Sequence, residues 1–81
     1  MDKIEIHYKH FGALLRYLRV EKGISQRELA EIVGVSRSAI AMYEIGARLP
    51  NRTNVRTIVE ILDIDMSVYY YLLFEEVFYG L

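Results

Sequence analysis

Two helix-start signals lie close together in the middle of this chain, and a glycine separates them. Ser25 is followed three residues later by Glu28, a pair that forms the capping box at the start of many helices. Gly34 can end this first helix because a residue without a Cβ atom adopts a left-handed backbone at no steric cost. Ser36 can then cap a second helix. The stretch at about residues 25–45 is therefore expected to form two short helices joined by a tight turn.

Apolar residues recur at helical spacing on both sides of this pair of helices. The spacing predicts five helices in all, and Asp65 can cap the last one. Near the N-terminus, Ile4, Ile6 and Tyr8 alternate with polar residues, so a short strand and an arm both remain open. The expected helices run roughly from His7 to Lys22, from Gln26 to Val33, from Ser36 to Gly46, from Thr53 or Asn54 onward, and from Met66 to Tyr79.

One face of each expected helix carries the apolar residues that would form the core. Ala30 is small at the point where the two central helices must cross closely, and Leu29, Val35 and Ile40 would fill the wedge between them. The other residues expected to face inward are Phe11, Leu14, Leu15, Leu18, Ile32, Val33, Ala39, Tyr43, Val55, Ile58, Val59 and Leu62.

The composition fits one small all-α domain spanning residues 1–81. There is no cysteine, which excludes disulfide bonds and thiolate metal sites and fits a reducing, cytoplasmic setting. The N-terminus lacks an apolar run long enough for a signal peptide. The longest uncharged apolar stretch lies within residues 66–74, well short of the roughly 20 residues that cross a bilayer. No membrane association is expected.

The charges are distributed unevenly along the chain, although the net charge is only −1. All ten Lys and Arg residues lie at or before Arg56, so residues 1–57 carry a net charge of +4 and residues 58–81 carry −5. Electrostatic attraction depends on the local field within a Debye length, about 10 Å at 0.1 M salt, rather than on the net charge. The basic part could therefore face nucleic acid, and an ordinary mixed-charge surface is the alternative.

The central stretch and the aliphatic segment TIVEILDI resemble the phage repressor and Cro-like helix-turn-helix family. The resemblance covers about residues 10–66. It implies a five-helix, lambda-repressor-like domain whose second central helix enters the major groove of double-stranded DNA. The motif positions that carry it are Gln26, Ala30, Gly34, Val35, Ile40, Glu44, Gly46 and Pro50.

The resemblance implies that the helix capped by Ser36 reads bases with its outward face. Arg37 can donate two hydrogen bonds to guanine O6 and N7, and an apolar side chain can contact a thymine methyl group. Ordinary solvation is the alternative for each of these residues. The expected base readers are Arg37, Ser38, Ala41 and Met42, and the expected phosphate contacts are Gln26, Arg27, Ser36, Arg48, Asn51 and Arg52.

The resemblance also implies a structural ion pair between Arg19 and Glu44. In the resembling family, an arginine near the end of the first helix pairs with the acid near the end of the third. Such a pair would brace the reading helix against the rest of the domain. Removing one partner of a buried pair typically costs about 3–5 kcal/mol because the other charge is left unpaired.

Six of the ten aromatic residues lie between Tyr69 and Tyr79. A helix at about residues 66–79 would be apolar on nearly all sides, and one small domain can bury only one of them. The exposed side predicts a partner, most simply an identical chain across a two-fold axis. A helix folded entirely onto its own domain is the alternative. The residues expected at the dimer interface are Val68, Tyr69, Leu72, Leu73, Glu75 and Tyr79.

These features predict a dimeric transcription regulator, either a repressor or a restriction–modification controller, that binds a roughly palindromic operator. The rival is an antitoxin or protein-interaction module whose C-terminal aromatic helix binds a different protein. No cluster of residues suits catalysis, and no cofactor or small-molecule ligand is expected. His7 and His10 are three residues apart, but a stable metal site needs further ligands, so no metal is expected.

Overall fold

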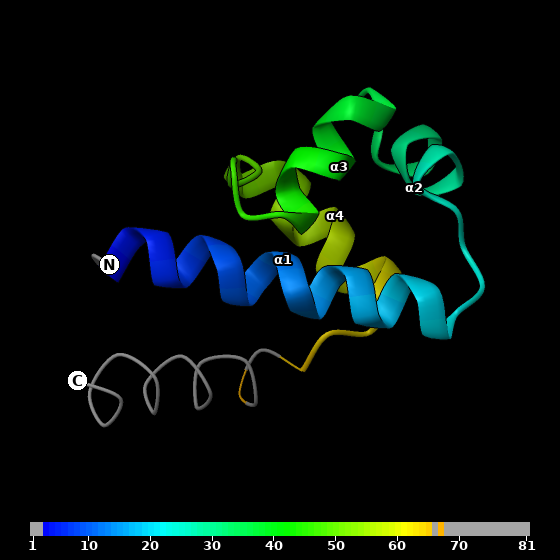
Figure 1. Cartoon of the computed structure of the whole chain (residues 1–81). Helices are drawn as coiled ribbons and strands as arrows, with labels where there is room; N and C mark the ends of the chain where they lie inside the picture. Colours follow the sequence, from blue (N-terminus) through cyan, green and yellow to red (C-terminus); the bar gives the residue numbers. More distant parts are fainter. Residues whose placement is uncertain (1–2, 66, 68–81) are drawn as a thin grey trace.

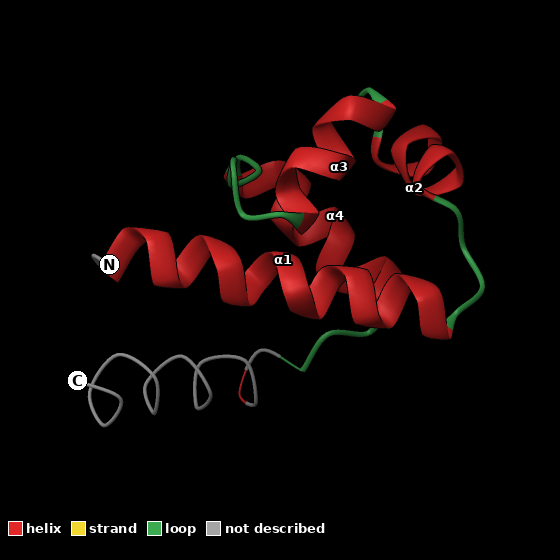
Figure 2. Cartoon of the chain, in the orientation of Figure 1, coloured by secondary structure: helices red, strands yellow, loops and turns green. Residues whose placement is uncertain are grey.

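The computed structural model describes the backbone of residues 3–65 and 67, and the side chains of residues 11–65 and 67. This part of the chain contains four α-helices and no strand (Figure 2). Helix α1 packs against both α3 and α4, and α2 packs mainly against α3 (Figure 1). The helices are α1 (Lys3–Glu21), α2 (Gln26–Val33), α3 (Arg37–Glu44) and α4 (Arg52–Leu62).

The N-terminal part of α1 differs from the sequence-based expectation. The helix begins at Lys3 rather than near His7, so both the strand and the arm expected there are wrong. Positions 4, 8 and 11 are also spaced as on one helical face, and extending an existing helix is favourable once its first turn has formed. An alternation of only three apolar residues was too short to indicate a strand.

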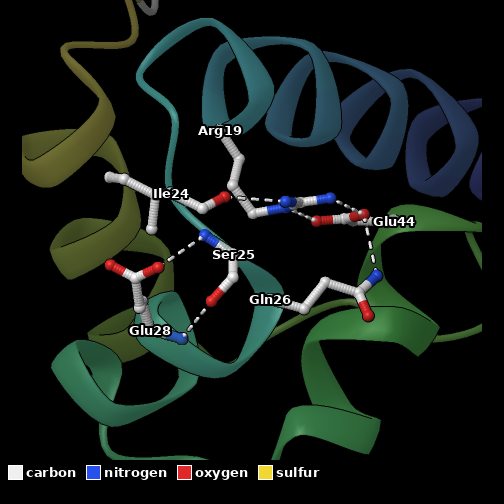
Figure 3. A network of polar contacts seen from close by, with 6 residues as sticks. All are labelled: Arg19, Ile24, Ser25, Gln26, Glu28 and Glu44. Atoms are coloured by element: carbon white, nitrogen blue, oxygen red, sulfur yellow. Dashed lines mark hydrogen bonds and ion pairs between the residues drawn. The ribbon is translucent and has the colours of Figure 1, made fainter.

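The start of α2 and the turn between α2 and α3 form as the sequence predicts. The Ser25 hydroxyl accepts a hydrogen bond from the backbone N–H of Glu28 at 3.0 Å, and the Glu28 carboxylate accepts one from the Ser25 backbone at 3.3 Å (Figure 3). Gly34 ends α2 with a left-handed backbone, φ +84°. The Ser36 hydroxyl then accepts from the backbone N–H of Ala39 at 3.0 Å. These local contacts fix the angle at which α3 leaves α2.

Helix α4 begins one residue earlier than the sequence predicts and has a cap at each end. It begins at Arg52, before Thr53, because the Asn51 side-chain oxygen accepts a hydrogen bond from the backbone N–H of Asn54 at 2.9 Å. It ends at Leu62 and is capped by Asp63, whose φ of +51° is the left-handed conformation that aspartate adopts more readily than most residues. The expected fifth helix, at about residues 66–79, lies outside the described residues.

The core forms where the inner faces of the four helices meet. Of the residues expected to face inward, Leu14, Leu18, Val33, Val55 and Val59 are half-buried against it. The buried apolar residues are Phe11, Leu15, Leu29, Ala30, Ala39, Ile40, Tyr43, Ile58, Leu62 and Ile64.

The expectation for Ile32 is wrong, because its side chain is 54% exposed. Leu29, Ala30 and Val33 turn the inner face of α2 toward the core, and successive residues rotate by about 100° around a helix. Ile32 therefore falls to one side of that face. In a helix this short, apolar spacing alone did not identify the inner side.

Gly12 permits the close approach of α1 and α3. A Cβ atom at this position would lie 2.2 Å from the carbonyl oxygen of Tyr43 and 2.7 Å from that of Glu44. Both are backbone atoms of α3 and cannot rotate away. A glycine inside a helix costs about 1 kcal/mol relative to alanine, so its presence in α1 was a signal that the sequence analysis missed.

No helix in the described part of the chain is both long enough and apolar enough to cross a membrane.

Candidate nucleic-acid interface

Helix α3 turns one side to the core and the other to solvent. Its buried side carries Ala39, Ile40, Tyr43 and Glu44. The expected base readers all lie away from that side, and the short helix shows no other buried residue. Arg37, Ser38 and Met42 are exposed, and Ala41 is half-buried.

The expected ion pair between Arg19 and Glu44 is present and joins α1 to α3 (Figure 3). Arg19 Nε donates to Glu44 Oε2 at 2.5 Å, and Arg19 Nη2 donates to Glu44 Oε1 at 3.1 Å. The third guanidinium nitrogen, Nη1, donates to the backbone oxygen of Ile24 at 2.8 Å. Glu44 is buried and Arg19 is partly buried, with 3% and 11% of their side chains exposed. The bidentate geometry fixes the direction of α3 relative to α1.

Gln26 extends this pair into a three-residue network (Figure 3). Its side-chain nitrogen donates to Glu44 Oε1 at 3.1 Å, so the Glu44 carboxylate also holds the start of α2. Gln26 is also one of the expected phosphate contacts. One of its amide N–H groups is committed to Glu44, and the donors left for a phosphate are its second amide N–H and the backbone N–H groups at the start of α2.

The pKa of the Arg19 guanidinium lies above its ordinary value. Hydrogen bonding to Glu44 is the main cause, the charge of Glu44 adds to it, and partial burial opposes both. A raised pKa in the folded state stabilises the fold below the unfolded-state pKa, and this contribution is lost only as the pH rises through the folded value. Arg19 therefore stays charged and keeps its contribution across neutral and mildly alkaline pH.

A polar hollow of about 300 Å³, here the Gln26 hollow, lies where α1, the start of α2 and the end of α3 meet. It brings two arginines of α1 beside the amide of Gln26. Arg16 was missed in the sequence analysis, although it lies three residues before Arg19 and so shares a face of α1 with it. The lining residues are Arg16, Arg19, Gln26, Ala41, Glu44 and Ile45.

A second hollow of about 420 Å³, here the Asn51 hollow, lies between the start of α3 and the start of α4. It brings together three of the expected phosphate contacts, Ser36, Arg48 and Asn51. Because the oxygens of Ser36 and Asn51 already accept the cap hydrogen bonds, the hydroxyl proton and the amide N–H groups are left as donors. The lining residues are Val35, Ser36, Ala39, Tyr43, Arg48, Leu49, Asn51 and Asn54.

Two further expected phosphate contacts, Arg27 and Arg52, are exposed on the first turns of α2 and α4. Neither residue lines either hollow. Their positions are open to solvent, so their role as phosphate contacts stays a prediction.

The two hollows touch different sides of α3. Ala41 and Ile45 line the Gln26 hollow, and Ala39 and Tyr43 line the Asn51 hollow. With about 100° of rotation per residue, Ser38 and Met42 fall between them. The Asn51 hollow lies beside the start of α3 and the Gln26 hollow beside its end. An exposed helix face with hydrogen-bond donors on both sides matches the requirements of major-groove reading, in which phosphate contacts position the base-reading side chains. The four helices of the described residues, with this surface, form the fold of a helix-turn-helix DNA-binding protein.

The comparison with known families agrees. The family model described as Helix-turn-helix matches residues 15–69, and the chain belongs to this family of phage repressor and Cro-like transcription regulators.

Three curated relatives share this region. The chain is 33% identical over 60 residues to the ImmF control region 10 kDa protein of Bacillus phage phi105. The matched region covers 74% of this chain and 67% of that protein. The chain is 33% identical over 57 residues to the uncharacterized HTH-type transcriptional regulator YqaE of Bacillus subtilis, covering 70% of this chain and 49% of YqaE. The prophage-derived regulator YonR of the same species is 33% identical over 54 residues, covering 67% of this chain and 50% of YonR. The chain thus spans about half the length of the two Bacillus subtilis relatives.

Solved structures share the fold. The clp gene regulator ClgR from Corynebacterium glutamicum superposes with a TM-score of 0.74 at 24% identity, covering 88% of this chain and 76% of ClgR. A mutant of the restriction–modification controller protein C.Esp1396I superposes with a TM-score of 0.69 at 24% identity, covering 88% of this chain and 92% of that protein. At this identity the likeness concerns the architecture alone.

Proposed function

We propose that this protein regulates transcription by binding a roughly palindromic operator as a homodimer, with α3 of each copy in the major groove. The observation that carries the proposal is the exposed face of α3, with Arg37 and Ser38 outward at its start, the Asn51 hollow beside that start and the Gln26 hollow beside its end. Solvent-facing polar residues at this place contribute nothing to the core. Their hydrogen-bonding groups suit contact with base edges. A cytoplasmic location would give the protein access to DNA.

In this proposal the two hollows bind backbone phosphates. The Gln26 hollow offers the N–H groups at the start of α2, where the helix dipole favours an anion, together with Arg16. The Asn51 hollow offers Arg48 and the free donors of its two capping residues. Arg27 and Arg52 would add further contacts at the edges. These interactions set the affinity and its salt dependence, and the side chains of α3 select the sequence.

Dimerisation would complete the mechanism. Two copies held with their reading helices about 34 Å apart would contact two half-sites one helical turn apart on the same face of the duplex. The relative from a phage control region supports a repressor or a controller as the output.

The proposed dimer contacts lie outside the described residues and rest on the aromatic composition of residues 66–79. They are Val68, Tyr69, Leu72, Leu73, Glu75 and Tyr79. Sedimentation of the purified chain tests them: a stable homodimer supports the regulator. A monomer that is recovered in a stable complex only with a different co-expressed protein would favour the antitoxin instead.

Selection of bound sites from a random pool of duplex DNA tests the proposed function as a whole. The expected result is an enriched sequence with two-fold symmetry and half-sites about 10 base pairs apart, centre to centre. Selection that enriches no sequence above the starting pool would contradict operator binding.

Arg37→Ala is expected to relax base preference at one position in each half-site and to weaken operator binding by about 1–3 kcal/mol. The reason is the loss of two hydrogen bonds to one guanine. Repeating the selection with the variant measures this change. The matched control is Arg48→Ala, which should weaken operator and non-cognate duplex alike and reduce the slope of log affinity against log salt by about 1. An unchanged site preference for Arg37→Ala would remove Arg37 from base readout.

A further inference from the structure

The solvent face of α3 changes character along its length. Its first residues, Arg37 and Ser38, carry hydrogen-bonding groups. The outward positions that follow are Ala41, which is half-buried, Met42, which is 41% exposed, and Ile45, the residue directly after the helix, which is 72% exposed. We call these three residues the apolar patch. Ile45 follows Ala41 by four residues and Met42 by three, so its position lies between theirs on one side of the helix end.

The surroundings of the apolar patch favour DNA as its occupant. Ala41 and Ile45 line the Gln26 hollow beside Arg16, so the patch borders directly on cationic and amide donors. An apolar protein surface docked there would cover these charges and leave them without water. A duplex would instead set its phosphates against Arg16 and the start of α2 and bring base edges over the patch. The patch is also continuous with Ser38 at the proposed reading tip.

We propose that the apolar patch reads the C5-methyl groups of pyrimidines in the major groove. The inference rests on the proposed function and specifies the kind of operator that the protein selects. Arg37 and Ser38 would recognise hydrogen-bonding edges, and the base pairs beneath Met42 would be selected for their methyl groups. Thymine carries such a methyl, and 5-methylcytosine carries the same group at the same place.

The chemistry of the patch accounts for this selectivity. None of its three side chains has a hydrogen-bond donor, and the methionine sulfur is only a weak acceptor. An unmethylated G·C pair facing the patch would lose water from its polar groups and gain no partner, which is unfavourable. A methyl group would be removed from water against Met42, whose flexible thioether adapts to irregular apolar surfaces.

Deoxyuridine substitution tests the proposal, because deoxyuridine differs from thymidine only by the missing methyl group. In the operator recovered by selection, each thymidine is replaced in turn and the affinity of the full chain is measured. Replacement at the positions beneath the patch should weaken binding about fourfold per methyl group, the ratio expected for burying one such group. Two further operators carry cytosine or 5-methylcytosine at the same position. The operator with 5-methylcytosine should bind about fourfold more tightly than the one with cytosine.

Two variants assign the effect to the patch. Met42→Gln has a similar length and an unbranched chain but carries an amide, and it should bind the thymidine and deoxyuridine operators with equal affinity at those positions. Arg37→Ala should bind the thymidine and deoxyuridine operators more weakly than the wild-type chain does, and the ratio of its two affinities should be unchanged. Circular dichroism of each variant confirms that it is folded.

The possible results distinguish a failure of methyl readout from a failure of operator binding. Specific operator binding that is indifferent to deoxyuridine at every position would overturn methyl readout and leave operator binding standing. A methyl effect that persists in Met42→Gln would also overturn it. The absence of specific binding to any duplex would overturn both proposals.

Discussion

Glu44→Ala is expected to lower the free energy of unfolding by about 3–5 kcal/mol. Glu44 is 3% exposed at its side chain and accepts hydrogen bonds from Arg19 and Gln26. Its removal would leave the partly buried Arg19 charge unpaired and release the start of α2 from α3. A chain of 81 residues is ordinarily stable by about 4–12 kcal/mol, so the loss would take a large share of the total.

Urea denaturation of the variant beside the wild-type chain measures this loss. The control is Arg37→Ala, an exposed position on the same helix, which should change the unfolding free energy by no more than about 0.5 kcal/mol. Coincident unfolding curves for the two variants would show that the network does not brace α3.

Gly12→Ala should destabilise the protein, although alanine is the better helix former by about 1 kcal/mol. The added Cβ would lie 2.2 Å from the Tyr43 carbonyl oxygen, and relief requires α1 to move away from α3. Overpacking of this kind typically costs about 1–3 kcal/mol and can cost more when backbone atoms are the obstacle. Because α3 would shift with α1, operator affinity should fall as well.

The adjacent exposed residue supplies the control for this variant. Ala13→Gly exchanges the same two residue types in the opposite direction at a solvent-facing position of α1, and should cost about 1 kcal/mol from helix propensity alone. Thermal unfolding of both variants distinguishes the two effects. A rise in the melting temperature of Gly12→Ala would mean that α1 and α3 are not in close contact at this residue.

The parts of the fold that the sequence predicted well are those set by neighbouring residues. The capping box of Ser25, the left-handed turn at Gly34 and the cap at Ser36 involve partners at most four residues away. Such signals can be read from one chain. The Arg19–Glu44 pair spans 25 positions and was predicted only through the resemblance to a family.

The features that the sequence analysis missed depend on how the helices pack. The role of Gly12 requires the α3 backbone to lie against α1, and the exposure of Ile32 depends on the rotation of α2 about its axis. Arg16 gains its place at the interface because α1 ends beside the start of α2. Gln26 acquires a second role through Glu44, which is 18 positions away. The marks that the chain does carry, a glycine inside α1 and the three-residue spacing of Arg16 and Arg19, do not identify the helix that packs against them.

In the proposed function, α3 reads operator bases while the hollows beside its start and its end bind phosphates. Titration of the selected operator and of a scrambled duplex with the full chain, over a series of salt concentrations, tests it most directly. We predict saturable binding, at least about 10³-fold tighter for the operator, with log affinity falling linearly as log salt rises. Equal affinity for the two duplexes, or binding that does not respond to salt, would contradict the account.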